Sequence, residues 1–283
     1  MKHILLPTDF SDNSWNAIKY AIQLFKNDAC TFHLLNTYTP IIYNVEHVLG
    51  YPAQFGLGDA IRNTSKENLK ELVNRISEEF SNNPYHKFET LARFDTLISG
   101  IKEFLKKNKT YMIVMGTQGA TGAKEVLFGS NTVHVFKEIK CPVLAIPSEF
   151  EYENPHDILF PTDLEVRYTE SMLSRLREIA TTHNSRINAM HVSTGIDLTD
   201  EQINKKQELE TYFKDNSFLY HELKSMNVDE AINKFQISTK TNMLVMINNK
   251  HSFFENLFFQ SKLKQIGFHL NIPFLVIPSI QKQ

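Results

Sequence analysis

The sequence is poor in cysteine and has no long hydrophobic run. Its 283 residues include only two cysteines, Cys30 and Cys141, which form no Cys-x-x-Cys pair. We therefore expect reduced thiols and no disulfide framework of the secreted type. The apolar run near the start, Ile4–Leu6, ends at a proline and is too short for a signal peptide. No run approaches the roughly 18 apolar residues of a membrane span, so we expect a cytoplasmic protein without a membrane partner.

An excess of charge of either sign is also missing. Lys and Arg number 30 and Asp and Glu number 32, which gives a net charge of −2. Binding to a nucleic-acid backbone requires a basic surface that displaces counterions, so nucleic acid is not an expected partner. The chain is 42% hydrophobic and has the length of about two ordinary domains. The composition thus predicts two globular units with substantial cores.

The sequence contains an internal repeat, which supports the division into two units. "HILLPTDFS" at 3–11 returns as "DILFPTDLE" at 157–165, and the segment 112–147 returns without a gap at 243–278. The offset falls from 154 to 131 because the second copy has a shorter middle. The joint between the copies is polar and contains Pro155. We expect one domain at 1–149 and a second at 154–283.

Within the first copy, short apolar runs alternate with amphipathic stretches. Strands are expected at 3–9, 31–38, 87–94, 111–116 and 142–147, and helices at 14–27, 60–80, 96–108 and 131–140. Such alternation predicts a parallel sheet with right-handed crossovers and helices on both faces. We therefore predict two doubly wound, five-stranded α/β domains, in which ligands bind beyond the carboxyl ends of the strands.

Glycine is scarce, yet four of the ten glycines lie in the stretch 114–132. Gly116 directly follows a predicted strand, and Gly129 and Ser130 precede the last predicted helix of the first copy. Glycine allows a close approach of ligand to backbone, and a helix N-terminus offers free N–H groups to an anion. Ser130 and Thr132 add hydroxyl donors. The stretch is typical of a phosphate cradle, although single glycines of this kind also serve as turn and capping residues.

The spacing Gly-x2-Gly-x9-Gly-Ser, together with "PTDFS" at 7–11, resembles the nucleotide-binding signature of the universal stress protein family. The resemblance extends over both copies and implies a tandem member with a Rossmann-like fold of the adenine nucleotide α-hydrolase type. In the ATP-binding branch of this family, triphosphate lies over the glycine loop, the aspartate after the first strand lies near ribose and phosphates, and main chain after the second strand meets adenine. Carried over residue by residue, the resemblance implies a binding set of Thr8, Asp9, Thr37, Met115, Gly116, Gly119, Gly129, Ser130 and Asn131.

The implied ligand is ATP, with AMP or ADP as alternatives. Thr37 enters the set through the alignment of "LLNTY" with "AMHVS" in the second copy. Asp9 has a second interpretation as a simple helix cap, which is common for an aspartate between a strand and a helix. Because its carboxylate would repel phosphate, Mg²⁺ is kept as an open alternative.

Several catalytic signatures are absent from the sequence. It has no Gly-x4-Gly-Lys-Ser/Thr loop, no Gly-x-Ser-x-Gly elbow and no His-x-x-x-His spacing. His134, on the last predicted helix of the first copy, is expected to be a helix-face residue. We therefore assign no catalytic residue and no metal ligand, and we expect at most slow ATP hydrolysis.

The second copy lacks the glycine signature. Adding 131 to the positions of the three signature glycines gives Ile247, Lys250 and Gln260, while Asp163 retains the aspartate after the first strand. Side chains would occupy the space that phosphate needs. The phenylalanine-rich segment 253–259 is explained either by ordinary core packing or by filling of the vacated pocket. We expect at most one nucleotide per chain.

Two functions are compatible with these observations. The first is a stress-response and regulatory module that binds an adenine nucleotide in the first domain. The alternative is an interaction scaffold of the same fold, or a binder of another phosphate-containing ligand. In either case the apolar, proline-flanked runs 142–147 and 273–278 are expected edge strands. Pairing them would cover both edges, so we predict an internal pseudo-dimer and leave a further homodimer open.

Overall fold

The computed structural model describes most of the chain. The described residues are 1–39, 54–80, 83–117, 129–193, 195, 197–224, 226–249 and 271–279, with only the backbone for 54–57. The first half contains β1 (Lys2–Pro7), α1 (Asp12–Leu24), β2 (Cys30–Tyr38), α2 (Gln54–Glu79), β3 (His86–Phe94), α3 (Leu97–Lys107), β4 (Met112–Gly116), α4 (Ser130–Glu138) and β5 (Val143–Ile146). The second half contains β6 (Asp157–Pro161), α5 (Glu170–His183), β7 (Arg186–Ser193), α6 (Asp200–Tyr212), β8 (Ser217–Lys224), α7 (Val228–Thr239), β9 (Met243–Asn248) and β10 (Phe274–Pro278).

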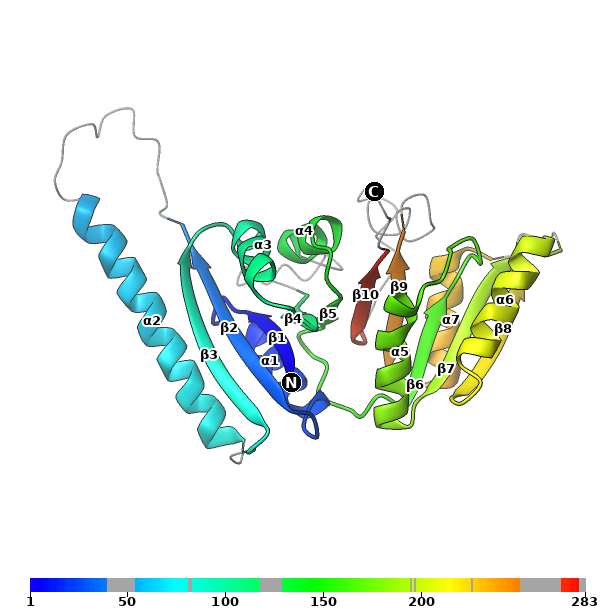
Figure 1. The fold of residues 1–283 in the computed structure, drawn as a ribbon, viewed down its shortest axis with the longest axis horizontal. Coiled ribbons are helices and arrows are strands. Elements are labelled where there is room, and N and C mark those ends of the chain that lie inside the picture. Colours follow the sequence, from blue (N-terminus) through cyan, green and yellow to red (C-terminus); the bar gives the residue numbers. More distant parts are fainter. Residues whose placement is uncertain are drawn as a thin grey trace.

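All of these strands form one ten-stranded sheet in the order β3-β2-β1-β4-β5-β10-β9-β6-β7-β8. The two halves repeat the same order in opposite directions from the centre, and their internal pairs are parallel. The central pair, β5 and β10, is antiparallel. Figure 1 shows these two strands beside each other, with β3 and β8 at the far ends. The predicted α/β class, with two doubly wound units packed as a pseudo-dimer, is confirmed.

Helices cover both faces of the sheet, and the inner strands carry apolar side chains on both faces. In β1, Ile4 and Leu6 face one hydrophobic cluster and Leu5 faces the other, which follows the two-residue period of a strand. Buried side chains of α1, α2, α5 and α6 belong to the first cluster, and those of α3, α4 and α7 belong to the second. This double burial explains why the strands appear in the sequence as continuous apolar runs.

Helix α2 begins earlier than predicted. It starts at Gln54 instead of residue 60, so its first turns include Gly56 and Gly58. Glycine is unfavourable in helices by about 1 kcal/mol relative to alanine, and the sequence pattern therefore does not predict these turns. A Cβ at Gly58 would meet no atom within 4 Å. The glycine thus has no packing role there.

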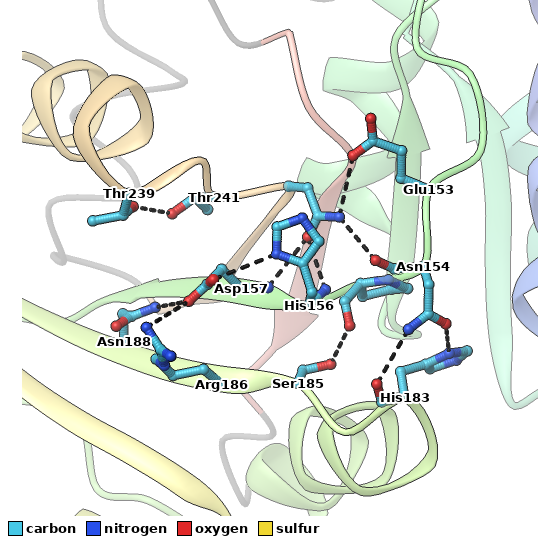
Figure 2. A network of polar contacts seen from close by, with 12 residues as sticks. Glu153, Asn154, His156, Asp157, His183, Ser185, Arg186, Asn188, Thr239 and Thr241 are labelled. Carbon is cyan, nitrogen blue, oxygen red and sulfur yellow. Dashed lines mark hydrogen bonds and ion pairs between the residues drawn. The ribbon is translucent and has the colours of Figure 1, made fainter.

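The segment between β5 and β6 is fixed to both halves. Asn16 of α1 donates from Nδ2 to the main-chain oxygens of Pro147 and Phe150, both at 3.0 Å. On the other side, Oδ1 of the buried Asn242 accepts from the N–H of His156 at 3.0 Å, and its Nδ2 donates to Asn154 O at 2.9 Å. Figure 2 shows this polar network around the start of β6. The joint is therefore no free tether between independent units.

Side chains from α5 reach across to the first half. Lys2 Nζ lies 2.9 Å from Asp28 Oδ1 and 2.9 Å from Glu178 Oε1, and the Tyr111 hydroxyl donates to Glu178 Oε2 at 2.7 Å. Arg175 lies over the Tyr111 ring at 4.1 Å from its centroid. Burial lowers the pKa of Lys2, but its bonds to the two carboxylates outweigh this and the net pKa is raised. The ion pair between Lys2 and Glu178 therefore joins the two halves.

Candidate functional site

The turn after β1 forms the first wall of the site. Phe10 has φ of 63°, a left-handed conformation, and its N–H donates to Thr8 Oγ1 at 3.0 Å. Asp9 Oδ1 accepts from the Ser11 N–H at 3.1 Å and from the Ser11 hydroxyl at 2.5 Å. The N-cap of α1 is Ser11, which accepts from the Ser14 N–H. Asp9 is therefore not the cap itself, and its exposed carboxylate lies at the edge of the sheet.

The end of β2 forms the second wall. Thr37 is half-buried, and its Cγ2 lies only 2.7 Å from where a Cβ on Gly100 would stand, so α3 packs closely against it. The preceding residue, Asn36, donates to Thr8 O at 2.8 Å and accepts from the Ser65 hydroxyl of α2 at 2.7 Å. Asn36 is absent from the predicted set. Its signal in the sequence is a single amide inside a buried apolar strand, since a buried amide needs partners.

The ends of β4 and α4 form the third wall. A Cβ on Gly116 would stand 2.3 Å from Nδ2 of Asn13, so only glycine allows this contact between β4 and α1. Helix α4 begins at Ser130, and its N-cap Gly129 makes no side-chain capping bond. The Thr132 hydroxyl, expected as a donor to ligand, instead donates to Gly116 O at 3.0 Å. It ties α4 to β4, because a buried hydroxyl requires a partner.

These walls enclose a cavity of about 140 Å³ at the carboxyl edge of the first half. The cavity is lined by Pro7, Thr8, Asp9, Ser14, Thr37, Leu97, Met115, Gly116, Asn131 and Thr132. Six of the nine predicted residues are therefore brought together there. Gly129 and Ser130 lie beside it, at the start of α4. Gly119 lies outside the described residues.

In the second half, Ile247, one residue before the end of β9, corresponds to Gly116 at the end of β4. The register supports this correspondence, because Gly116 pairs with Ile146 and Ile247 pairs with Ile277. Ile247 is 7% exposed, so its side chain fills space at that edge. The other predicted replacements, Lys250 and Gln260, and the segment 253–259 lie outside the described residues.

In the described part of the chain, the His, Cys, Asp and Glu residues contain no group of three or more that could hold a metal ion. None of its helices is long and apolar enough to cross a membrane. His134 is exposed on α4, in agreement with its interpretation as a helix-face residue.

The fold and the edge cavity define a Rossmann-like α/β protein with a cavity where a glycine ends β4. The model of the universal stress protein family matches residues 1–147, more than half of the chain. The protein belongs to this family.

Individual relatives agree with the assignment. A curated universal stress protein of Methanocaldococcus jannaschii is 34% identical over 149 residues, which cover 51% of this chain and 81% of the relative. The crystal structure of a universal stress protein from Archaeoglobus fulgidus DSM 4304 covers 98% of this chain and 96% of its own, with a TM-score of 0.68 and 17% identity. It supports the fold over both halves. A universal stress protein solved in complex with cAMP matches 51% of this chain and 96% of its own at 19% identity and a TM-score of 0.34, too low to bear on the site.

Proposed function

We propose that the first half of the chain binds an adenine nucleotide, ATP, and that the protein is a stress-response module regulated by nucleotide occupancy. The proposal treats the chain as a tandem of two units, residues 1–149 and 154–283, of which only the first binds nucleotide. The observation that carries it is the N-terminus of α4, whose N-cap Gly129 makes no side-chain capping bond, at a cavity that Gly116 at the end of β4 also lines.

The phosphates would lie against the start of α4. Free N–H groups and the partial positive charge at a helix N-terminus favour anions. Ser130 and Asn131 are exposed there and add polar side chains, while Gly129 leaves room for a phosphate oxygen. In this proposal Gly119 contributes a second close approach of backbone to phosphate.

The sugar and base would lie toward the ends of β1 and β2. The Asp9 carboxylate can accept hydrogen bonds from ribose hydroxyls, and Thr37 lies where adenine would contact the end of β2. AMP and ADP would share these contacts. If Asp9 instead faces the phosphates, Mg²⁺ is required between the two anionic groups, because they repel each other.

The cavity of about 140 Å³ is smaller than the ~300–1,000 Å³ of typical small-molecule sites. The described residues line it from the ends of β1, β2 and β4 and the start of α4, and the segment 118–128 is not among them. No general base or arginine clamp is assigned from the sequence, so turnover should be below the ~1 s⁻¹ of ordinary enzymes.

Calorimetric titration with ATP tests the proposal. Gly129 has φ of −60° and ψ of 154°, a conformation open to any residue, so a Gly129→Val variant should fold normally. It should nevertheless lose ATP binding, because a side chain would enter the phosphate position. The matched control is Gly58→Val, at a glycine whose Cβ would meet nothing within 4 Å. Undiminished affinity in a folded Gly129→Val variant would contradict the proposal.

The same titration gives the stoichiometry. We expect one nucleotide per chain, because Ile247 occupies the position of Gly116 in the second half. Mass spectrometry of the ligand released by heating the purified protein identifies the nucleotide. A protein that carries no nucleotide and binds none would instead favour the scaffold function.

A further inference from the structure

The second half contains a cavity of about 350 Å³ between the ends of β6 and β7 and the start of α6. It is larger than the cavity of the first half, and it is shifted away from β9 toward α6. Its lining includes His191 and three acidic residues, Asp163, Glu165 and Asp197. A volume of this size falls in the ~300–1,000 Å³ range of small-molecule sites.

His191 in this cavity corresponds to Asn36 of the first half. The residues before them, Leu35 and Met190, pair with the last prolines of β1 and β6 in the same register. Asn36 donates to Thr8 O at 2.8 Å, and His191 Nδ1 lies 3.0 Å from Thr162 O. Because a carbonyl oxygen can only accept, Nδ1 carries the proton. The two side chains thus make the same structural bond.

Asn36 and His191 differ in the surroundings of their second polar atom, which is Oδ1 in Asn36 and Nε2 in His191. Oδ1 of Asn36 accepts from Ser65 on the long helix α2. The matching helix α6 has 13 residues against 26 in α2, and no described residue hydrogen-bonds to Nε2 of His191. His191 is only 7% exposed and lines the cavity. Because His191 lines the cavity, its Nε2 is accessible there to a ligand that donates a proton.

The charge of the cavity indicates the kind of ligand. Asp163, Glu165 and Asp197 supply three carboxylates, and the described lining residues include no Lys or Arg. This negative field opposes a phosphate group. A single metal ion does not fit either, since the described carboxylates and histidines do not converge into a possible metal group. Separated acceptors around one cavity favour a ligand with more than one cationic donor.

We propose that this cavity binds an aliphatic diamine or polyamine. One ammonium group donates to His191 Nε2, and the remaining charge is balanced by Asp163, Glu165 and Asp197. The methylene chain lies on the apolar part of the lining, which includes Met190, Leu198 and Val228. The site in the second half thus prefers cations, whereas the proposed site in the first half prefers anions. It needs no glycine loop.

The test is calorimetric titration of the full chain with 1,4-diaminobutane at physiological ionic strength. Asp197→Asn removes one carboxylate at an exposed position and should weaken binding about tenfold, the value of a charge-assisted hydrogen bond. His191→Asn retains the bond to Thr162 O, as Asn36 does in the first half. The remaining acceptor, the amide Oδ1, is set back from the cavity by about one bond length relative to Nε2 and is misplaced for the ammonium group. It should weaken binding by a similar factor.

The matched control is Asp215→Asn, an exposed acidic residue between α6 and β8 that does not line the cavity. Its affinity for diaminobutane should equal that of the unmodified protein. The proposal is overturned if the unmodified protein does not bind diaminobutane, or if Asp215→Asn weakens binding as much as Asp197→Asn does. It is also overturned if diaminobutane is displaced by ATP or by Mg²⁺ alone. Should His191→Asn fail to fold, the exposed Asp197→Asn variant decides the question.

Discussion

Phe10 and Leu164, 154 residues apart, share one backbone conformation, with φ of 63° and 60°. In both cases the N–H donates to the hydroxyl of the threonine two residues earlier, at 3.0 Å. The N–H of the following residue also donates to an aspartate in both halves. Ser11 donates to Asp9 Oδ1, and Glu165 donates to Asp163 Oδ1. A left-handed residue other than glycine costs roughly 1–2 kcal/mol. The hydroxyl therefore serves to stabilise a strained turn in both halves.

Replacing Thr8 or Thr162 by valine should destabilise the protein by about 1–2 kcal/mol in each case. The substitution preserves shape but leaves the N–H of Phe10 or Leu164 without its acceptor. Urea unfolding measures the loss. The two variants should differ in function, because only Thr8→Val lies in the proposed nucleotide site and should weaken ATP binding. Equal ATP affinity in the two variants would contradict the assignment of Thr8.

The close contact of Gly116 with Asn13 leads to a second prediction. Gly116→Ala places a methyl group 2.3 Å from Asn13 Nδ2, so it should cost about 1–3 kcal/mol of stability. Asn13→Ala in the same chain removes the obstructing amide. The double variant should therefore lose less stability than the sum of the two single variants, as a double-mutant cycle in urea would measure. If the two losses of stability are additive, the contact between Gly116 and Asn13 is not the cause of the destabilisation in Gly116→Ala.

Much of this architecture is predictable from the sequence because the inner strands are buried on both faces. That burial produces runs such as 142–147, and their flanking prolines mark an edge that needs a partner. The antiparallel pairing of β5 with β10 confirms the prediction. The positions of six predicted site residues around one cavity also follow from the rule that ligand sites lie at strand ends.

Other features depend on contacts that local patterns do not contain. The early start of α2 runs against the low helix propensity of Gly56 and Gly58. The partner of Asn36 is Ser65, 29 residues away on another helix. The cavity around His191 brings together residues of β6, β7 and the start of α6, which are far apart in the sequence. Each of these features depends on tertiary contacts. A comparison of the two repeats shows which positions correspond, but it does not predict the contacts that those positions make.

Glu178 at the junction of the halves should make stability depend on pH. Burial raises the pKa of this carboxyl, but hydrogen bonds from Lys2 and Tyr111 outweigh it, and the net pKa lies below the ordinary 4.5. The stabilisation is thus fully present above pH 4.5 and is lost as the pH falls through the lower folded pKa. Glu178→Gln should cost about 1–2 kcal/mol at neutral pH, a modest value because solvent screens a side chain that is 38% exposed.

Urea unfolding over a pH series checks this prediction. The difference between Glu178→Gln and the unmodified protein should shrink in acid, since protonated Glu178 no longer pairs with Lys2. Glu170→Gln is the control on the same helix, because Glu170 pairs with Arg177 at an exposed site and should contribute about 0–1 kcal/mol. If the stability difference between Glu178→Gln and the unmodified protein stays constant through the acid range, the charge of Glu178 does not contribute to stability.

The β5–β10 ladder should be essential to the stability of the whole chain. Ala145 pairs with Phe274 and Val276 pairs with Val143, and both substituted positions are at most 2% exposed. Phe136 of α4 also packs edge-on against Phe274, with ring centroids 5.6 Å apart, so the central pair is covered by the helix layer. A lysine introduced on either strand would bury an unpaired charge at the junction. Ala145→Lys and Val276→Lys should each cost more than about 3 kcal/mol.

The matched control lies on the outer edge of the same sheet. Leu219 on β8 is 46% exposed, so Leu219→Lys places the same charge on a strand where water can solvate it and should change stability by no more than about 0.5 kcal/mol. Urea unfolding of the full chain compares the three variants. If the halves were independent units, Ala145→Lys would destabilise only the first half, and the unfolding curve would split into two transitions. If the central strands hold the halves together, both halves lose stability, and the two central variants have the same effect because they disrupt the same ladder from opposite sides.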